Sequence, residues 1–250
     1  MSRPPLPEST DAQPLQWLAS LLFTAFLFVS TIVFSLLVLA FGWLPPSGRY
    51  RIVRGWAATE MVALKWLCGL DYAVEGQHHI PPTGGHISMW KHSSTWETLA
   101  QALIMPPQAW VLKREILWIP LIGWATWLMQ PIAIDRGAGH AAVNQVVQQG
   151  RARLAAGLWV LVFPEGTRVP AGQTKKYGIS GALLAVAAGC KVVPVAHNAG
   201  RYWGRRGLLK KRGTIRVVIG PPIEAAGREP RAINEDARAW IDAKVAELGA

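Results

Sequence analysis

A histidine and a glutamate lie five residues apart in the segment 91–97, which reads KHSSTWE. An imidazole can act as a general base near neutral pH when a carboxylate holds its tautomer. On one continuous helix, His92 and Glu97 would lie about 140° apart and could not touch, because a helix has about 3.6 residues per turn. They can meet if His92 lies in a turn and Glu97 lies in the first turn of the next helix.

The same segment carries a signal for the start of a helix. The residues from Ser94 to Glu97 fit the capping-box pattern, which predicts a helix that begins at Ser94. Two interpretations of the pair therefore stay open at this point. Glu97 could orient His92 for general-base catalysis, or Glu97 could only cap the helix while His92 is an ordinary loop histidine.

A second segment, 163–168, reads FPEGTR and directly follows the apolar run 158–162. A glycine such as Gly166 lets backbone N–H groups approach a ligand closely. Arg168 offers a planar fork that suits phosphate. The alternative is a turn at a strand end with a surface arginine. Lys113 and Arg136 place further cations at the ends of two predicted strands, although ordinary solvated charges would give the same pattern.

The elements that must position these residues are short apolar runs separated by helical patterns. The runs are typical of buried strands. Ile233, Ala237, Ile241 and Val245 fall on one face of a C-terminal helix. The alternation predicts an α/β domain with a mixed, largely parallel sheet and flanking helices. The predicted strands are 86–90, 109–113, 131–135, 158–163, 191–196 and 214–219, and the other helices are 141–156 and 180–188.

An uncharged N-terminal stretch predicts a membrane anchor. The strongly apolar part, 17–44, would form a helix of about 42 Å, which exceeds a hydrocarbon core of about 30 Å. One tilted span, or a span with an interfacial extension, would fit, and Pro45 and Pro46 supply a stop signal. A cleaved signal peptide is the competing interpretation. The stretch 56–70 is predicted to be an interfacial helix, and 117–133 to pack on the domain or to dip into the interface.

These features divide the chain into a membrane anchor with an interfacial helix, residues 1–70, and a catalytic domain, residues 71–250. Basic residues follow the apolar run at Arg49, Arg51 and Arg54. The positive-inside rule therefore predicts an inner-membrane protein whose catalytic domain faces the cytoplasm.

The net charge of +11 is concentrated in one part of the chain. The stretch 166–223 contains no Asp or Glu, and seven of its cations fall in 201–216. Such a surface attracts an anionic partner, and nucleic acid, anionic lipid and an acidic carrier protein are all candidates on charge alone. Tyr202, Trp203, Leu208 and Leu209 lie among the cations, which favours a dock for anionic lipid or a carrier protein over a solvated loop. The seven cations are Arg201, Arg205, Arg206, Lys210, Lys211, Arg212 and Arg216.

Taken together, the H-x4-E segment, the lysine segment with a later I-D-R, the FPEGTR box and the V-P-V run 193–195 resemble the glycerolipid acyltransferases. The bacterial 1-acyl-sn-glycerol-3-phosphate acyltransferases are the most similar member type. The resemblance covers roughly residues 85–222. It implies acyl transfer from a thioester, either acyl-CoA or acyl carrier protein, to a lysophospholipid at a phospholipid membrane.

The resemblance also implies a role for each matching residue. His92 would deprotonate the acceptor hydroxyl, and Glu97 would orient His92. The phosphate-side cations would be Lys113, Arg136 and Arg168, and the acceptor pocket would be shaped by Glu165, Gly166 and Thr167. The V-P-V run would be an apolar strand near the acyl groove.

Other classes of protein lack their sequence signals here. No G-x-S-x-G elbow supports a serine hydrolase, and no recognition helix or aromatic RNA-binding strand supports nucleic-acid binding. The six histidines form no HExxH or Cys/His cluster, so no metal and no cofactor is predicted. The two cysteines, Cys68 and Cys190, are expected to be small core residues, with a disulfide as the minor alternative.

Overall fold

A seven-stranded sheet forms the centre of the computed structural model, which describes residues 14–135 and 137–249. The strand order is β1-β7-β6-β2-β5-β3-β4. The five strands from β6 to β4 are parallel to one another, and β7 runs antiparallel to β6. The strands are β1 (Leu70–Glu75), β2 (Ile87–Trp90), β3 (Gln108–Lys113), β4 (Ile132–Ile134), β5 (Trp159–Val162), β6 (Val192–His197) and β7 (Gly213–Ile219).

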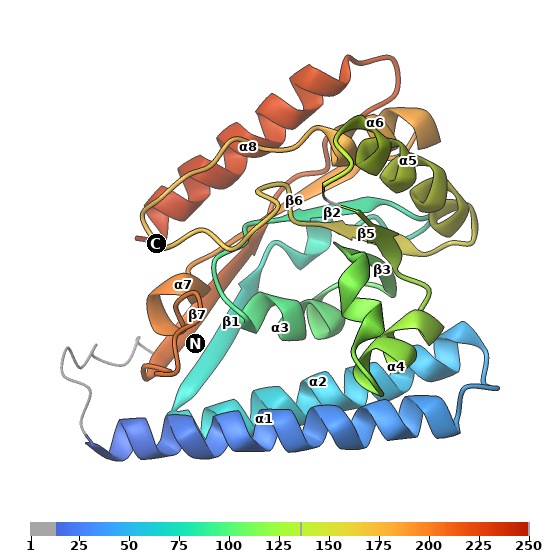
Figure 1. Ribbon diagram of the computed structural model, residues 1–250. Helices are drawn as coiled ribbons and strands as arrows, with labels where there is room; N and C mark the ends of the chain where they lie inside the picture. The colour runs from blue at the N-terminus through green and yellow to red at the C-terminus, as the bar shows by residue number, and fades with distance from the viewer. Residues whose placement is uncertain (1–13, 136, 250) are drawn as a thin grey trace.

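Helices cover both faces of the sheet (Figure 1). One face packs against α5 (His140–Ala155), α6 (Ser180–Ala188) and α8 (Pro230–Glu247). The other face packs against α3 (Trp96–Ile104) and two long N-terminal helices, α1 (Pro14–Ala40) and α2 (Pro46–Cys68). The central strands β2, β5 and β6 are buried along their whole length, which explains why their sequences are nearly continuous apolar runs.

The predicted α/β class with a mixed, largely parallel sheet is confirmed, and each predicted strand corresponds to one of β2–β7. The strand β1 was not predicted, because its sequence LDYAVE is partly exposed at the sheet edge and follows directly on an apolar helix. Gly69, with φ +65°, ends α2 and turns the chain into this strand. It pairs with β7 from Leu70↔Gly213 to Glu75↔Val218.

Among the described residues, α1 is the one helix that is long and apolar enough to cross a membrane. It is nevertheless attached to the rest of the protein at both ends. The Gln16 side chain donates to the Cys68 and Lys210 carbonyls, and the other end of α1 packs against α4 (Ile122–Leu128). Phe23 of α1 is fully buried in the core. The helix α1 therefore packs against α2, α4 and the core of the domain, and is not an isolated helix.

The helix α2 is longer than the interfacial helix predicted at 56–70. Pro46, which was expected to supply a stop signal after the apolar helix, occupies the first turn of α2, where proline needs no N–H partner, and α1 ends before it, at Ala40. Glu60 of α2 is buried and accepts a hydrogen bond from Ser30 of α1. A polar contact therefore joins the two helices inside an otherwise apolar interface.

Lys210 is buried, which corrects the expectation that the cations of 201–216 all lie on the surface. Its Nζ donates to the carbonyls of Ser20 and Leu208, at 3.3 and 2.8 Å, and to the Thr24 hydroxyl. It also lies over the Phe23 and Trp203 rings. Burial lowers the pKa of Lys210 to about 8, against the opposing effect of Cys68. This lysine fastens α1 to the catalytic domain.

Candidate active site

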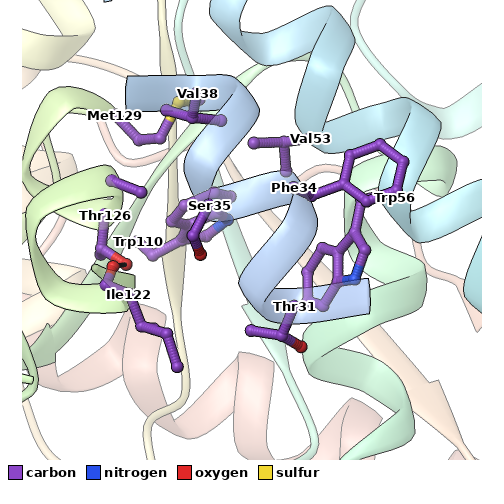
Figure 2. A pocket seen from close by; sticks show the side chains of 11 residues that line it. Thr31, Phe34, Ser35, Val38, Val53, Trp56, Trp110, Ile122, Thr126 and Met129 are labelled. Atoms are coloured by element: carbon purple, nitrogen blue, oxygen red, sulfur yellow. Dashed lines mark hydrogen bonds between the residues drawn. The ribbon is translucent and has the colours of Figure 1, made fainter. Parts of the chain in front are cut away.

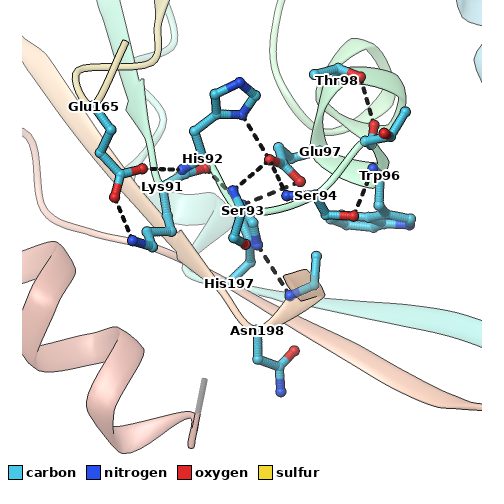
Figure 3. Close-up of polar contacts among 12 residues, drawn as sticks. Lys91, His92, Ser93, Ser94, Trp96, Glu97, Thr98, Glu165, His197 and Asn198 are labelled. Atoms are coloured by element: carbon cyan, nitrogen blue, oxygen red, sulfur yellow. Dashed lines mark hydrogen bonds and ion pairs between the residues drawn. The ribbon is translucent and has the colours of Figure 1, made fainter. Parts of the chain in front are cut away.

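His92 lies in the short loop between β2 and α3, beyond the carboxyl end of a central parallel strand. Ligand sites of open α/β sheets lie at this edge. Figure 3 shows that the side chains of His92, Glu97, Glu165 and His197 gather there from three segments far apart in the sequence. The sheet therefore brings together the H-x4-E segment, the FPEGTR box and the end of the V-P-V strand.

The His92 imidazole and the Glu97 carboxylate form a hydrogen-bonded pair, with 2.9 Å between Nδ1 and Oε1. The same Oε1 accepts the backbone N–H groups of Ser93 and Ser94, at 2.9 and 2.8 Å. Ser94 Oγ in turn accepts the N–H of Trp96 at 3.1 Å. Glu97 thus caps the helix and orients His92 at once. The helix begins at Trp96, two residues after the predicted Ser94.

The environment keeps Glu97 ionised. Complete burial would raise the pKa of its carboxyl, but His197, His92 and the Ser94 N–H oppose burial and bring the pKa below its usual value. A carboxylate at Nδ1 keeps the proton of neutral His92 on that nitrogen, so Nε2 can accept another. The His92 side chain is 13% exposed and stacks on Phe163, with ring centroids 4.0 Å apart. These features suit a general base.

The FPEGTR box is tied to His92 by its main chain and by Glu165. The Val169 N–H donates to the His92 carbonyl at 2.8 Å. One Glu165 oxygen accepts the His92 N–H at 2.7 Å, and the other accepts a hydrogen bond from Lys91 Nζ. Burial raises the pKa of Glu165, although Lys91 and the His92 N–H oppose that shift. Both carboxylate oxygens of Glu165 therefore accept hydrogen bonds from within the protein. Its predicted contact with the acceptor remains a prediction.

The remaining residues of the box are closer to solvent. Gly166 is exposed with φ +68°, a conformation that favours glycine, and a Cβ there would meet nothing within 4 Å. Thr167 and Arg168 are half-buried. Arg168 directly precedes Val169, whose N–H holds the His92 carbonyl. Arg168, which was predicted to bind phosphate, is thus close to the His92 loop in space.

Lys113, one of the further cations predicted to bind phosphate, lies farther along the same sheet edge. Lys113 ends β3, which is separated from β2 by β5, so the strands are about 10 Å apart. The Lys113 side chain is 50% exposed and pairs with Glu115 at 3.1 Å. Arg136 lies outside the described residues. The neighbouring Asp135 pairs with Arg114 at 2.9 Å.

Two residues of this site were not assigned a role from the sequence, Lys91 and His197. Lys91 is buried and pairs with Glu165. His197 is the last residue of β6, is fully buried, and lies 3.9 Å from the second Glu97 oxygen. The signal for His197 was its place directly after a predicted strand beside β2. Its distance of 105 residues from His92 gave no local spacing to recognise.

Within 14–135 and 137–249, no group of three or more His, Cys, Asp and Glu side chains could hold a metal ion. Cys68 and Cys190 are free and buried, as predicted for core residues.

Comparison with known proteins places these motifs in a family. The sequence model of the Acyltransferase family matches residues 71–198. The 1-acyl-sn-glycerol-3-phosphate acyltransferase of Pseudomonas aeruginosa is 46% identical over 209 residues, covering 82% of this chain and 81% of that protein. The corresponding alpha enzyme of Mus musculus is 30% identical over 66% of this chain and 59% of that protein.

A solved structure has the same fold. It is the crystal structure of the 1-acyl-sn-glycerophosphate acyltransferase PlsC from Thermotoga maritima, with a TM-score of 0.79 and 20% identity. The match covers 94% of this chain and 96% of that one. The family model and the Pseudomonas relative together confirm the resemblance found in the motifs: the chain belongs to the Acyltransferase family and is an acyltransferase similar to the 1-acyl-sn-glycerol-3-phosphate acyltransferases.

Proposed function

We propose that this enzyme moves a fatty acyl group from an acyl thioester to the free hydroxyl of 1-acyl-sn-glycerol 3-phosphate, which gives phosphatidic acid. The observation that carries the proposal is the bonded pair of His92 and buried Glu97 at the carboxyl edge of the sheet. The printed names of the relatives support the acceptor. The donor is acyl-CoA or acyl carrier protein, a co-substrate rather than a cofactor.

In the proposed reaction, His92 Nε2 takes the proton of the acceptor hydroxyl while the oxygen attacks the thioester carbonyl carbon. The resulting imidazolium is stabilised by ionised Glu97 at Nδ1. When the C–S bond breaks, the imidazolium returns the proton to the leaving thiolate, so an ester and a free thiol result. General acid–base help of this kind contributes about 10²- to 10⁴-fold.

The acceptor and donor are tested together by a product assay. Purified full-length enzyme is offered lysophosphatidic acid, lysophosphatidylglycerol and lysophosphatidylcholine. Each acceptor is tested with acyl-CoA and with the acyl thioester of acyl carrier protein, and the products are identified by mass. We expect phosphatidic acid as the main product. Ester formation on another lyso-lipid alone would reassign the acceptor, and release of free fatty acid without any ester would overturn acyl transfer.

Arg168→Ala should impair phosphate-bearing acceptors more than neutral ones. Arg168 is a half-buried cation of the FPEGTR box, and it directly precedes Val169, whose N–H bonds to the His92 carbonyl. Losing a hydrogen bond to a charged group costs about 1.5–3 kcal/mol, or about 10- to 150-fold in kcat/KM. The measurement compares lysophosphatidic acid with monoacylglycerol as acceptors. An equal loss with both would show that Arg168 only supports the fold, and exposed Arg151→Ala is the matched control.

We further propose that the enzyme works at a phospholipid membrane. Large apolar side chains of α1 are exposed, and so are aromatic residues at the turns and helices beside it, which is typical of a membrane-interface surface. Trp118, just before α4, and Trp124 and Trp127 on α4 extend this surface, which supports the alternative in which part of 117–133 dips into the interface. The other exposed members include Leu15, Trp17, Leu18, Leu21, Leu22, Phe28, Val29, Trp43 and Trp66.

An apolar cavity of about 110 Å³ lies within this surface, between α1, α2, β3 and α4. Figure 2 shows Phe34, Trp56, Trp110 and Met129 around it, and the lining also includes Thr31 and Ser35. An apolar lining beside a lipid-facing helix supports a substrate that carries an acyl chain. We propose that part of an acyl chain enters here.

A basic rim borders the N-terminal end of α1. We define it as the exposed side chains of Arg205, Arg206, Lys211 and Arg212. In the described part of the chain, none of these four forms an ion pair. Hydrogen bonds from Gln16 to the Lys210 carbonyl and from the Lys210 N–H to Ser20 hold the rim against α1. We propose that it binds anionic lipid headgroups.

Reversing two rim charges, in Lys211→Glu/Arg212→Glu, should weaken binding of the full chain to anionic vesicles. Each cation near an anionic bilayer contributes about 1 kcal/mol, so we expect a loss of about tenfold or more. Flotation with phosphatidylcholine vesicles, with and without phosphatidylglycerol, measures it. Binding to pure phosphatidylcholine should hardly change.

The control for this reversal is Arg151→Glu/Arg231→Glu, which changes the net charge equally on α5 and α8, across the sheet from α1. Unchanged vesicle binding with a lower rate for the carrier-protein donor alone would assign the rim to the donor instead. No change in either, even at low salt where screening is weak, would mean that the rim is only a solvated loop.

A further inference from the structure

His197 lies on the opposite side of Glu97 from His92, in a fully buried position. Its ring sits between those of Trp90 and Trp96, with centroid distances of 6.1 Å to each. A fully buried histidine must satisfy both ring nitrogens, because an unpaired buried polar group is costly. The partners of these two nitrogens indicate what the residue does.

The hydrogen bonds of His197 define its tautomer. The Ala199 N–H points to Nδ1 at 3.2 Å, so Nδ1 accepts. The proton of the neutral ring is therefore on Nε2, which donates to the Lys91 carbonyl at 2.9 Å. Burial lowers the pKa of His197, against the opposing charge of Glu97, and this keeps the ring neutral. His197 thus holds the main chain directly before His92.

The same Nε2–H faces Glu97. All three hydrogen bonds to the Glu97 carboxylate end on Oε1, and Oε2 has no hydrogen-bond partner among the described residues. The His197 Nε2 lies 3.9 Å from that oxygen. This is too long for a hydrogen bond, but inside a buried site an N–H dipole still attracts a carboxylate oxygen.

We propose that His197 is a positioning residue for acyl transfer: its Nε2–H fixes the Lys91 carbonyl and faces Glu97 Oε2, so that Glu97 holds the His92 imidazole in one orientation. The inference rests on the proposed role of His92 as general base. His197, at the end of β6, would thus support the pair of His92 and Glu97. It acts through Glu97 and the main chain and does not touch the substrate.

Two amide substitutions separate the two nitrogens of His197. In His197→Gln the side-chain NH₂ can reach the place of Nε2, whereas in His197→Asn the shorter side chain can replace only Nδ1. We expect Gln to keep kcat within about threefold of the wild type. We expect Asn to lose at least about tenfold in kcat with KM nearly unchanged, because misoriented general bases slow the chemical step without weakening binding.

Three measurements accompany this comparison. The same two substitutions at exposed His78 are the control, and circular dichroism gives the folded fraction to which each kcat is referred. His92→Ala is assayed alongside. Substantial activity in His92→Ala would contradict the proposed general-base role of His92, on which this inference rests. If His92→Ala is inactive but His197→Gln and His197→Asn lose kcat equally, the positioning role of His197 is wrong. A loss confined to KM in the His197 variants would overturn that role in the same way.

A spectroscopic test does not depend on how well the variants fold. In wild-type enzyme with ¹⁵N-labelled histidine, the His197 ring should give the signals of a neutral Nε2–H tautomer at neutral and alkaline pH, since Nδ1 accepts the Ala199 N–H and burial disfavours the charged form. A ring protonated on Nδ1, or a ring that becomes charged in this range, would contradict the proposal.

Discussion

Replacing His92 by alanine should lower the rate of acyl transfer by at least about 100-fold, because the general base is lost and general acid–base catalysis contributes about 10²- to 10⁴-fold. The fold should survive. The His92 side chain is partly exposed, and the main-chain bonds at this position, to Glu165 and Val169, do not need the imidazole. The measurement is kcat with a labelled acyl thioester and lysophosphatidic acid, with circular dichroism to confirm the fold.

His140→Ala is the matched control, since His140 is exposed at the start of α5 and away from the Glu97 carboxylate. It should leave the rate unchanged. A His92→Ala enzyme that keeps more than about a tenth of the wild-type rate would contradict the general-base role. Loss of helical signal in that variant would mean that His92 is needed for the fold rather than for the chemistry.

The sequence predicted most of the sheet because the central strands are buried on both faces. Runs such as 158–163 are apolar at every position, so they stand out in the sequence as short continuous apolar segments. The interpretation of Glu97 shows a limit of local patterns. A capping glutamate and a catalytic partner were alternatives in the sequence, yet one oxygen, Oε1, receives the Ser93 and Ser94 N–H groups together with His92.

Contacts between distant segments could not be predicted. The stretch 166–223 has no acid of its own, but the sheet places Glu75 of β1 beside Arg216 of β7 at 2.9 Å. Lys191 likewise pairs with Glu224, just beyond the stretch. Lys210 looked like one more surface cation, and only the packing of α1 against the domain buries it. Charge patterns along a chain therefore overstate the net field at a surface when strands far apart in sequence are paired.

The buried ion pair of Lys91 and Glu165 leads to the second large expected effect, on stability. Both side chains are almost inaccessible, at 3% and 0% exposure. Glu165→Gln keeps the shape and an oxygen for the His92 N–H but leaves Lys91 buried without a counter-charge. Breaking a buried pair in this way costs about 3–5 kcal/mol. Urea unfolding of the full chain in detergent should show a loss of this size.

The double variant Lys91→Met/Glu165→Gln makes this prediction specific. It removes both charges, and replacing a whole buried pair by packed neutral groups is often close to neutral, so most of the lost stability should return. Asp71→Asn is the control, because it breaks an exposed pair with Lys65 and should cost less than about 1 kcal/mol. If Glu165 acts only by holding His92, the double variant should also recover most of its kcat, since the Gln oxygen still accepts the His92 N–H. A stable double variant whose KM for lysophosphatidic acid rises more than about tenfold would instead assign Glu165 to the acceptor, as the motif resemblance implied.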